Sequence, residues 1–134
     1  MEYLLDTNIC IYIIKQKPLV VFEKFKTLQL GQVGISTITL AELQFGLEKS
    51  SNPNQNKEAL DKFLIPIEIV DFDFNASTEY GRIRASLEKK GQSIGPLDTL
   101  IAAHALSIAA TLVTNNEKEF KRVDGLKLEN WILN

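Results

Sequence analysis

The chain has 134 residues, and its 15 lysines and arginines against 17 aspartates and glutamates give a formal net charge of −2. This length predicts a single domain spanning residues 1–134, since domains usually hold ~100–200 residues. The charge balance excludes a histone-like binder that relies on an overall basic excess, but a basic groove on one face is still compatible with it. Hydrophobic residues at 45% and charged residues at 24% indicate a folded chain rather than a disordered one.

Cysteine usage and hydropathy bear on where the protein resides. The single cysteine, Cys10, lies in an apolar run and has no partner for an internal disulfide, which favours a reducing environment. Asp6 interrupts the first apolar stretch before a signal-peptide core could form, and no apolar run approaches the ~20 residues of a membrane span. We therefore expect a cytoplasmic protein that does not associate with membranes.

In the first third of the chain, short apolar runs alternate with helical patterns. Residues 3–5 predict a strand, and the Asp-Thr-Asn that follows consists of residue types that cap helices, ahead of an apolar helical run. Apolar spacing then predicts a helix over 18–30, a strand over 33–36 and a helix over 38–47.

The rest of the chain continues this alternation after a polar, turn-rich stretch at 50–56, which predicts a surface loop. The later elements are a helix over 60–64, a strand over 65–70, helices over 76–89 and 96–108, and strands over 110–114 and 126–131. Strands that alternate with helices indicate an α/β fold with a central parallel sheet of four to five strands and helices on both faces.

Three acidic residues, Asp6, Glu42 and Asp98, differ from the other acids because apolar residues flank them. A carboxylate close to the core is costly unless a cation or hydrogen bonds compensate for its charge. Asp6 ends a predicted strand and the other two are expected in the first turns of helices, so all three are expected at the strand ends where open α/β sheets bind ligands. Carboxylates without cysteine or clustered histidine favour Mg²⁺, for which Mn²⁺ can substitute, over Zn²⁺.

Polar residues after the predicted strand over 110–114 extend this candidate site. Asn115 and Asn116 can supply an amide oxygen beside the acids, and Glu119 lies about one helical turn further on. The predicted metal ligands are therefore Asp6, Glu42, Asp98, Asn116 and Glu119.

Each acid also has a simpler explanation at a helix terminus. Asp6 can cap a helix, Thr39 and Glu42 have the spacing of a capping box, and Asp98 is placed where a negative charge stabilises the helix dipole. Three such acids together favour a metal site over three independent caps. His104, on the apolar side of its helix, is interpreted as a packed histidine rather than a ligand.

Four segments of the chain, in order, match the motifs of a known family: 5–8 (LDTN), 39–46 (TLAELQFG), 94–105 (IGPLDTLIAAHA) and 112–120 (LVTNNEKEF). They resemble the PIN-domain ribonucleases, and most closely the VapC-type toxins of bacterial type II toxin–antitoxin pairs. The resemblance extends from residue 3 to residue 131 and so covers nearly the whole chain.

The resemblance implies a PIN-like fold and Mg²⁺-dependent endonucleolytic cleavage of RNA. Asp6, Glu42 and Asp98 match the acidic catalytic positions of the family. Four neighbouring residues are expected to orient these ligands: Thr7, Asn8, Thr114 and Asn115. Many PIN domains have an aspartate after the fourth strand where this chain has two asparagines, so the resemblance leaves the number of metal ions open.

RNA must reach this acidic site through basic residues, of which Arg84 and Lys121 are the predicted phosphate contacts. Other candidates for the same role are Lys15, Lys17, Arg82, Lys89, Lys90, Lys118 and Arg122, and the alternative for every one of them is a solvated helix face.

The resemblance also implies partners for the chain. Toxins of this type are usually homodimers, and a small VapB-like antitoxin neutralises them by wrapping its C-terminal segment around the toxin. The implied substrate is transfer RNA. For the most similar toxins it is initiator transfer RNA, which is cut in the anticodon loop. Apolar residues of the first two helices, Ile11, Ile14, Phe22 and Phe25, either face the antitoxin or belong to the core.

Two other functions fit the sequence less well. A haloacid-dehalogenase-type phosphatase expects a second aspartate where Asn8 stands, and a dinucleotide-binding domain expects a glycine-rich motif after the first strand. A non-catalytic PIN-like module that binds RNA or a protein would normally lack one or more of the three acids, all of which are present.

Overall fold

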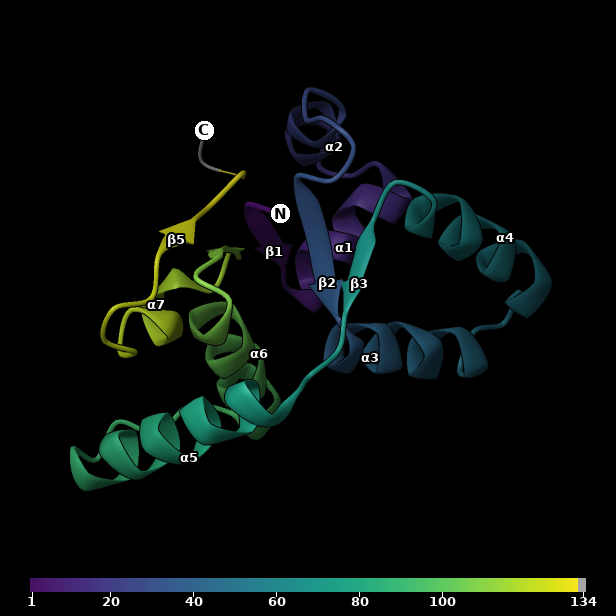
Figure 1. The fold of residues 1–134 in the computed structure, drawn as a ribbon. Coiled ribbons are helices and arrows are strands. Elements are labelled where there is room, and N and C mark those ends of the chain that lie inside the picture. The colour runs from purple at the N-terminus through teal and green to yellow at the C-terminus, as the bar shows by residue number, and fades with distance from the viewer. Residues whose placement is uncertain (133–134) are drawn as a thin grey trace.

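The computed structural model describes residues 1–132, and its centre is a parallel five-stranded sheet with helices on both sides (Figure 1). The strands are β1 (Tyr3–Leu5), β2 (Val33–Ser36), β3 (Glu68–Val70), β4 (Thr111–Val113) and β5 (Leu128–Glu129). They lie in the order β3-β2-β1-β4-β5 and all pair in parallel. The predicted α/β class with a central parallel sheet is therefore confirmed, with five strands.

Helices fill the connections between the strands: α1 (Thr7–Lys15), α2 (Leu19–Lys26), α3 (Thr37–Glu48), α4 (Pro53–Leu64), α5 (Phe74–Lys89), α6 (Pro96–Ser107) and α7 (Glu117–Phe120). Several begin where the sequence offers a cap. Asp73 accepts a hydrogen bond from the Ala76 amide at 3.0 Å at the start of α5, and Pro96 supplies a fixed φ at the first position of α6. Among residues 1–132, no helix is both long enough and apolar enough to cross a membrane.

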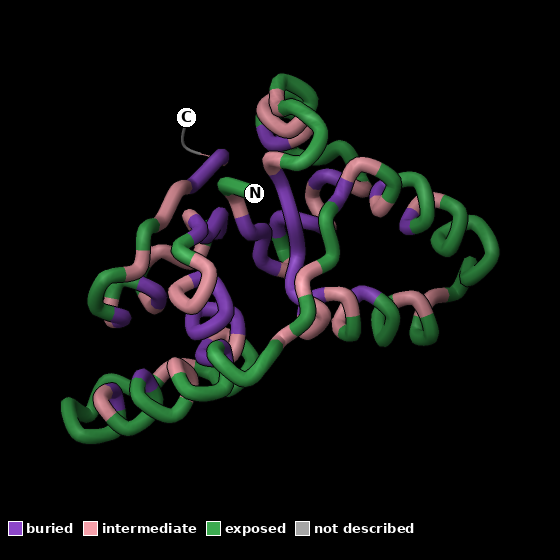
Figure 2. The backbone as a smooth tube through the Cα atoms, viewed as in Figure 1, coloured by how far each residue is buried: buried purple, intermediate pink, exposed green. Residues whose placement is uncertain are grey.

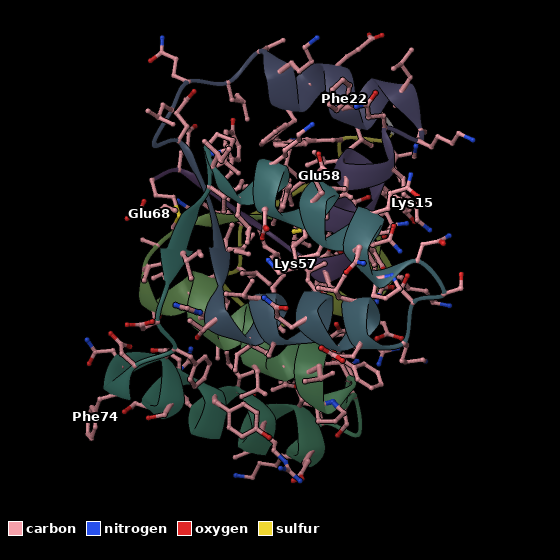
Figure 3. The ribbon with its side chains drawn as sticks, turned by 90° about the vertical axis from the view of Figure 1, so that its right-hand side faces the viewer. Lys15, Phe22, Lys57, Glu58, Glu68 and Phe74 are labelled. Carbon is pink, nitrogen blue, oxygen red and sulfur yellow. The ribbon has the colours of Figure 1, made fainter. Side chains whose placement is uncertain are left out.

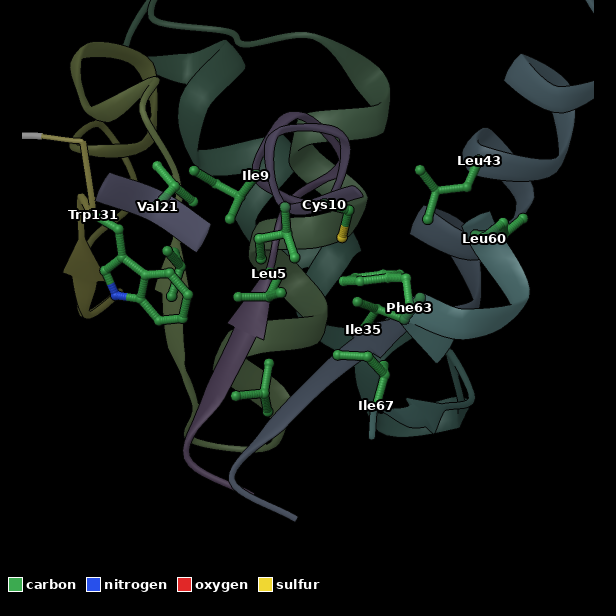
Figure 4. Close-up of a cluster of buried hydrophobic side chains, with 13 residues drawn as sticks. Leu5, Ile9, Cys10, Val21, Ile35, Leu43, Leu60, Phe63, Ile67 and Trp131 are labelled. Atoms are coloured by element: carbon green, nitrogen blue, oxygen red, sulfur yellow. The ribbon is translucent and has the colours of Figure 1, made fainter. Parts of the chain in front are cut away.

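Alternation of side chains along β1 divides the core into two halves. Leu4 and Leu5 are both fully buried, but they point to opposite faces of the sheet. Leu5 belongs to a cluster with Ile9, Phe63 and Trp131, drawn from α1, α4 and the chain end (Figure 4). Leu4 belongs to a second cluster built on α5, α6 and the α7 region. Figure 2 shows the buried strands between these layers and the exposed outer sides of α4 and α5.

Four predicted boundaries in the chain were wrong. The predicted loop over 50–56 ends at Asn52, because Pro53 occupies the first position of α4 and the polar residues after it form the exposed start of that helix. The strand predicted over 65–70 is only β3, since Ile65 keeps a helical backbone as the C-cap of α4. The strand predicted over 126–131 is the two-residue β5.

The helix predicted over 18–30 is shorter in the structure, where α2 spans only Leu19–Lys26. Thr27 ends it, and its hydroxyl donates a hydrogen bond to the Lys24 carbonyl at 2.6 Å. The apolar residues after Thr27 belong to the connection to β2.

Parallel pairing brings the carboxyl ends of β1 and β4 together. Leu5 pairs with Val113 in the sheet register, and the amide of the next residue, Asp6, donates a hydrogen bond to the Val113 carbonyl at 3.0 Å. The residues that follow these two strands, Asp6 and Thr114, are therefore neighbours although 108 positions separate them in the chain.

Candidate active site

Asp6 lies at the junction of β1 and α1 and is only 7% exposed. Its Oδ1 accepts a hydrogen bond from the Ile9 amide at 2.9 Å. Asp6 is therefore the N-cap of α1, the simpler role considered for it above. The second carboxylate oxygen is not needed for this cap. A single buried aspartate can therefore both start the helix and offer an oxygen to a ligand.

The pocket beside Asp6 has a volume of about 320 Å³ and contains all three predicted acids. Asp98 is the third residue of α6, in its first turn as predicted. Glu42 is the sixth residue of α3, so it lies in the second turn and not in the first. Thr7 and Asn8, from the first turn of α1, also line this pocket.

The capping box proposed for Thr39 and Glu42 is not formed. The cap of α3 is Ser36, whose hydroxyl accepts a hydrogen bond from the Ile38 amide at 3.0 Å, and Thr39 lies inside the helix, fully buried. Glu42 is therefore free of a capping role at the start of α3, and its half-buried carboxylate lies at the pocket with Asp6 and Asp98.

Electrostatic interactions link these acids to each other. Burial and, to a smaller extent, the nearby Asp98 carboxylate together raise the pKa of Asp6 to about 6, although hydrogen bonds from Thr114 and from the Ile9 and Asn8 amides lower it. Burial also raises the pKa of Asp98, as does the charge of Glu119, whereas a hydrogen bond with the Asn116 side chain lowers it. Asp6, Asp98 and Glu119 thus form a chain of like charges, which a bound cation would stabilise.

Thr114 holds Asp6 from the end of β4. It is fully buried, its hydroxyl is hydrogen-bonded to the Asp6 carboxylate, and its Oγ1 accepts a hydrogen bond from the Asn116 amide at 3.0 Å. Asn115 is turned to a different partner, because its Nδ2 donates to the Tyr12 hydroxyl at 3.1 Å. Asn116, and not Asn115, is the amide that the structure brings to the acids.

The donor set of this pocket is compatible with Mg²⁺. Its oxygens come from three carboxylates and from the side chains of Thr7 and Asn8, and carboxylate and amide oxygens are ligands that hard divalent cations take. Asn116 and Glu119 do not line the pocket and reach it only through their interactions with Asp98. Within residues 1–132, no three Asp, Glu, His or Cys side chains are close enough to enclose a metal ion by themselves. This open arrangement suits Mg²⁺, which usually binds one or two protein carboxylates and keeps several waters or substrate oxygens.

The predicted phosphate contacts lie outside this pocket. Arg84 is exposed on α5, where its Nη1 donates to the Tyr80 hydroxyl at 2.9 Å, and Lys121 is exposed at the end of α7. Lys15 lies beside an apolar groove of about 440 Å³ between α1, α3 and α4, on the face shown in Figure 3.

Three of the other basic candidates already have partners in the chain. Arg82 pairs with Glu79, Lys90 pairs with Asp124 at 3.2 Å, and Arg122 donates to the Ser93 carbonyl at 3.0 Å. The other four basic candidates are all exposed: Lys15, Lys17, Lys89 and Lys118.

Apolar walls of the active-site pocket were not predicted. Ile11, Ile38 and Ile101 line it, and so does Leu97, which is 47% exposed. The position of Leu97 directly before Asp98 was the one signal in the sequence. His104 is fully buried and packs edge-to-face on Phe72, with ring centroids 5.5 Å apart, which confirms its interpretation as a packed histidine.

The raised pKa of Asp6 predicts how the stability of the metal-free protein depends on pH. Between the unfolded pKa of 3.8 and the folded value of about 6, the folded state holds a proton that the unfolded chain has released. The free energy of unfolding therefore falls as pH rises through this window, by about 2 kcal/mol between pH ~4.5 and pH ~7.5 for this one group.

Urea unfolding in EDTA at these two pH values measures the effect. The Asp6→Asn variant keeps a good N-cap, but its side chain cannot ionise. The free energy of unfolding of this variant should therefore change with pH by about 2 kcal/mol less than that of the wild type. Asp73→Asn, at the exposed N-cap of α5, controls for replacing a capping aspartate. Equal pH dependence in the wild type and Asp6→Asn would show that burial does not perturb Asp6.

Comparison with known proteins places the chain among characterised sequences. A PIN-domain family model matches residues 3–126. The tRNA(fMet)-specific endonuclease VapC of Shigella flexneri is 46% identical over 131 residues, and the ribonuclease VapC2 of Rickettsia felis is 49% identical over 132 residues; each alignment covers 98% of both chains. A crystal structure of VapBC2 from Rickettsia felis bound to a promoter DNA fragment superposes with a TM-score of 0.91 at 48% identity, covering 98% of this chain and 99% of the other.

Proposed function

The chain belongs to the VapC family of PIN-domain ribonucleases, the toxins of VapBC toxin–antitoxin pairs, and on this basis we propose that it hydrolyses RNA with the help of Mg²⁺ held by Asp6 and Asp98. One observation carries the proposal. Asp6, Glu42 and Asp98, from three separate elements, line one pocket at the carboxyl ends of the central strands, where α/β sheets bind ligands.

The roles of the acids follow from their surroundings. Asp6 and Asp98 are the direct ligands, because they are coupled by charge and are the acids whose ionised forms are costly without a cation. Mn²⁺ can replace Mg²⁺ because both accept oxygen ligands. When bound, the ion supplies charge neutralisation at the phosphodiester and acidifies a coordinated water.

The chain's own groups move the proton and orient the ligands. Glu42 of α3, which lines the same pocket, is the proposed general base that accepts the proton of the attacking water. Water adds to phosphorus while the bond to the 3′ oxygen breaks, and the 3′ oxygen takes up a proton from solvent, which leaves a 3′-hydroxyl and a 5′-phosphate. Thr114 fixes the Asp6 carboxylate through its hydroxyl, and Thr7 and Asn8 form the adjoining wall.

Asn116 and Glu119 complete the proposed site on the side of α7. The Asn116 side chain hydrogen-bonds Asp98, and the Glu119 charge raises the pKa of Asp98, so both lie next to the same carboxylate. Glu119 takes the place of the aspartate that many PIN domains have after the fourth strand.

We propose transfer RNA as the substrate, and initiator transfer RNA cut in the anticodon loop in particular, because the Shigella flexneri relative carries that specificity in its name. Arg84 and Lys121 are the proposed contacts to the RNA. The proposed place of action is the cytoplasm, where transfer RNA is found.

A VapB-like antitoxin is the proposed inhibitor, bound to a homodimer of this chain. The groove of about 440 Å³ between α1, α3 and α4 can receive an apolar segment of it, since Ile11, Ile14 and Leu47 line this groove and Glu42 lies on its border with the active-site pocket. Phe22 and Phe25 of α2 pack against the same core cluster as these apolar residues but do not line the groove.

The proposed substrate is tested by cleavage of purified transfer RNAs in Mg²⁺. Initiator transfer RNA should be cut at one position in the anticodon loop at least about tenfold faster than elongator methionine transfer RNA, because the two share an anticodon and differ in the surrounding stem. Product ends mapped by sequencing should carry a 5′-phosphate. Equal cleavage of both RNAs would contradict the initiator specificity, and cleavage of neither would contradict the proposed substrate class.

A further inference from the structure

A second cavity, of about 190 Å³, lies on the other side of the first turn of α6. Leu97 and Asp98 face the active-site pocket, whereas Pro96 and Thr99, in the same turn, line this second cavity. A helix is about 10 Å across, so an RNA strand of a few nucleotides can occupy both sides of the turn at once. The cavity is therefore placed to bind a part of the substrate adjacent to the bond that is cut.

The floor of this cavity is apolar and aromatic. Leu87 is 3% exposed, and Tyr80 and Ile94 are half-buried against the core cluster on that side of the sheet. Because Tyr80 is packed from behind, its ring is held in place. Single-stranded RNA is commonly recognised by stacking of unpaired bases on such fixed aromatic rings and on arginine planes.

Two opposite charges form the rim of this cavity. The Arg84 guanidinium lies over the Tyr80 ring, 6.0 Å from its centroid, and its Nε is 3.7 Å from Glu88 Oε2. A phosphate group would be attracted by Arg84 but repelled by Glu88. A nucleobase edge carries hydrogen-bond acceptors for arginine and amino donors for a carboxylate, so it can use both groups.

We propose that this cavity is a subsite for one unstacked nucleobase of the RNA substrate, with Tyr80 as the stacking surface and with Arg84 and Glu88 reading the base edge. The proposal rests on the proposed ribonuclease function and deepens it. It assigns Arg84 a base contact in place of a phosphate contact.

The test is binding of short single-stranded RNA oligonucleotides to the full-length protein carrying Asp98→Asn, which should bind RNA without cutting it. The probes are a panel that differs in the base at one position, and affinity is measured by fluorescence anisotropy. Tyr80→Leu and Arg84→Gln should each weaken binding about tenfold, and Glu88→Gln about fivefold with an altered base preference. Tyr80→Phe should weaken binding less than Tyr80→Leu, because it keeps the ring and loses only the hydroxyl that accepts a hydrogen bond from Arg84 at 2.9 Å.

Arg82→Gln is the matched control for Arg84→Gln. Arg82 lies two residues away on the same helix, is paired with Glu79 and does not line this cavity, so its replacement should change affinity less than about twofold. Melting temperatures of all variants establish that they fold. Arg84 and Glu88 are exposed surface residues, so their variants test the subsite even if Tyr80→Leu does not fold.

Salt dependence separates a base contact from a phosphate contact. Loss of one phosphate contact lowers the slope of log affinity against log salt by about 0.7 for a single strand. If Arg84→Gln lowers the slope by that amount and Glu88→Gln tightens binding, the cavity binds phosphate and the proposal is wrong. Unchanged affinity in all the cavity variants would also overturn it.

The same experiment distinguishes this subsite from the proposed function. If wild-type protein cuts RNA and Asp98→Asn does not, but the cavity variants bind and cut normally, only the subsite is refuted. If neither the wild type nor Asp98→Asn binds or cuts RNA, the ribonuclease function and the subsite fail together.

Discussion

Asp98→Asn is expected to reduce RNA cleavage by at least about 100-fold while leaving the fold intact. Asparagine has the same shape, keeps the first turn of α6 and can still hydrogen-bond with Asn116, but it lacks the charge that holds a divalent cation. Asp6→Asn should have the same effect, because Asp6 is the other proposed ligand. Initial rates of cleavage of a labelled transfer RNA, with circular dichroism to verify folding, measure the loss.

Asp124→Asn is a suitable control for these variants. Asp124 is an aspartate of the same charge on the exposed turn after α7, paired with Lys90 at 3.2 Å and remote from the pocket that Asp6 lines. Its replacement should leave the rate within about twofold, since exposed ion pairs contribute little. Normal cleavage by both Asp6→Asn and Asp98→Asn would refute the proposed metal-dependent mechanism.

The second large change in RNA cleavage is expected when divalent cations are removed. Dialysis against EDTA should reduce RNA cleavage to background, and Mg²⁺ or Mn²⁺ should restore it, because the pocket offers only oxygen donors. Mn²⁺ bound to the protein can also be counted directly by electron paramagnetic resonance, which reports one or two ions independently of activity. Glu119→Gln should lower that count or that affinity if Glu119 is a direct ligand.

The metal-removal experiment has its own control in protein stability. Wild-type protein should gain thermal stability when Mg²⁺ is added, because the ion relieves repulsion between Asp6 and Asp98, whereas Asp98→Asn should gain less. Cleavage by the wild type that continues in excess EDTA would contradict the role of the metal, whatever the behaviour of the variants.

Local sequence patterns were sufficient to predict most of the architecture. Apolar runs bounded by capping residues marked β1 and α1, and the alternation of such runs predicted a parallel sheet covered on both faces. Boundaries failed where local signals conflicted. The polar residues after Pro53 indicated a loop, but they form the exposed side of α4, whose apolar side carries Leu60 and Phe63 into the core.

In the candidate site, too, local patterns predicted some features correctly and others wrongly. Asp6 and Asp98 were recognisable because apolar neighbours surround them, and the structure brings both to one pocket. Glu42 was expected in a first turn, with a capping box as the alternative to a metal-binding role, but it lies in the second turn and the actual cap is Ser36, the last residue of β2. A capping pattern of two residues cannot reveal which residue ends the preceding strand, because that depends on pairing with a distant strand.

Flanking residues and periodicity thus predicted the fold class and the acids proposed to bind the metal, since both predictions depend on patterns within a few residues of the chain. Thr114 and Asn116 were expected near the acids, but local patterns could not show which partner each of them would take. They also could not show that Asn115 would turn to Tyr12, or that Arg84 would lie over Tyr80 at a separate cavity. Those contacts arise from the register of β1 against β4 and from the packing of α5 on α6, which join segments far apart in the chain. Such long-range pairings are set by burial of the two core clusters as a whole, and no local pattern encodes them.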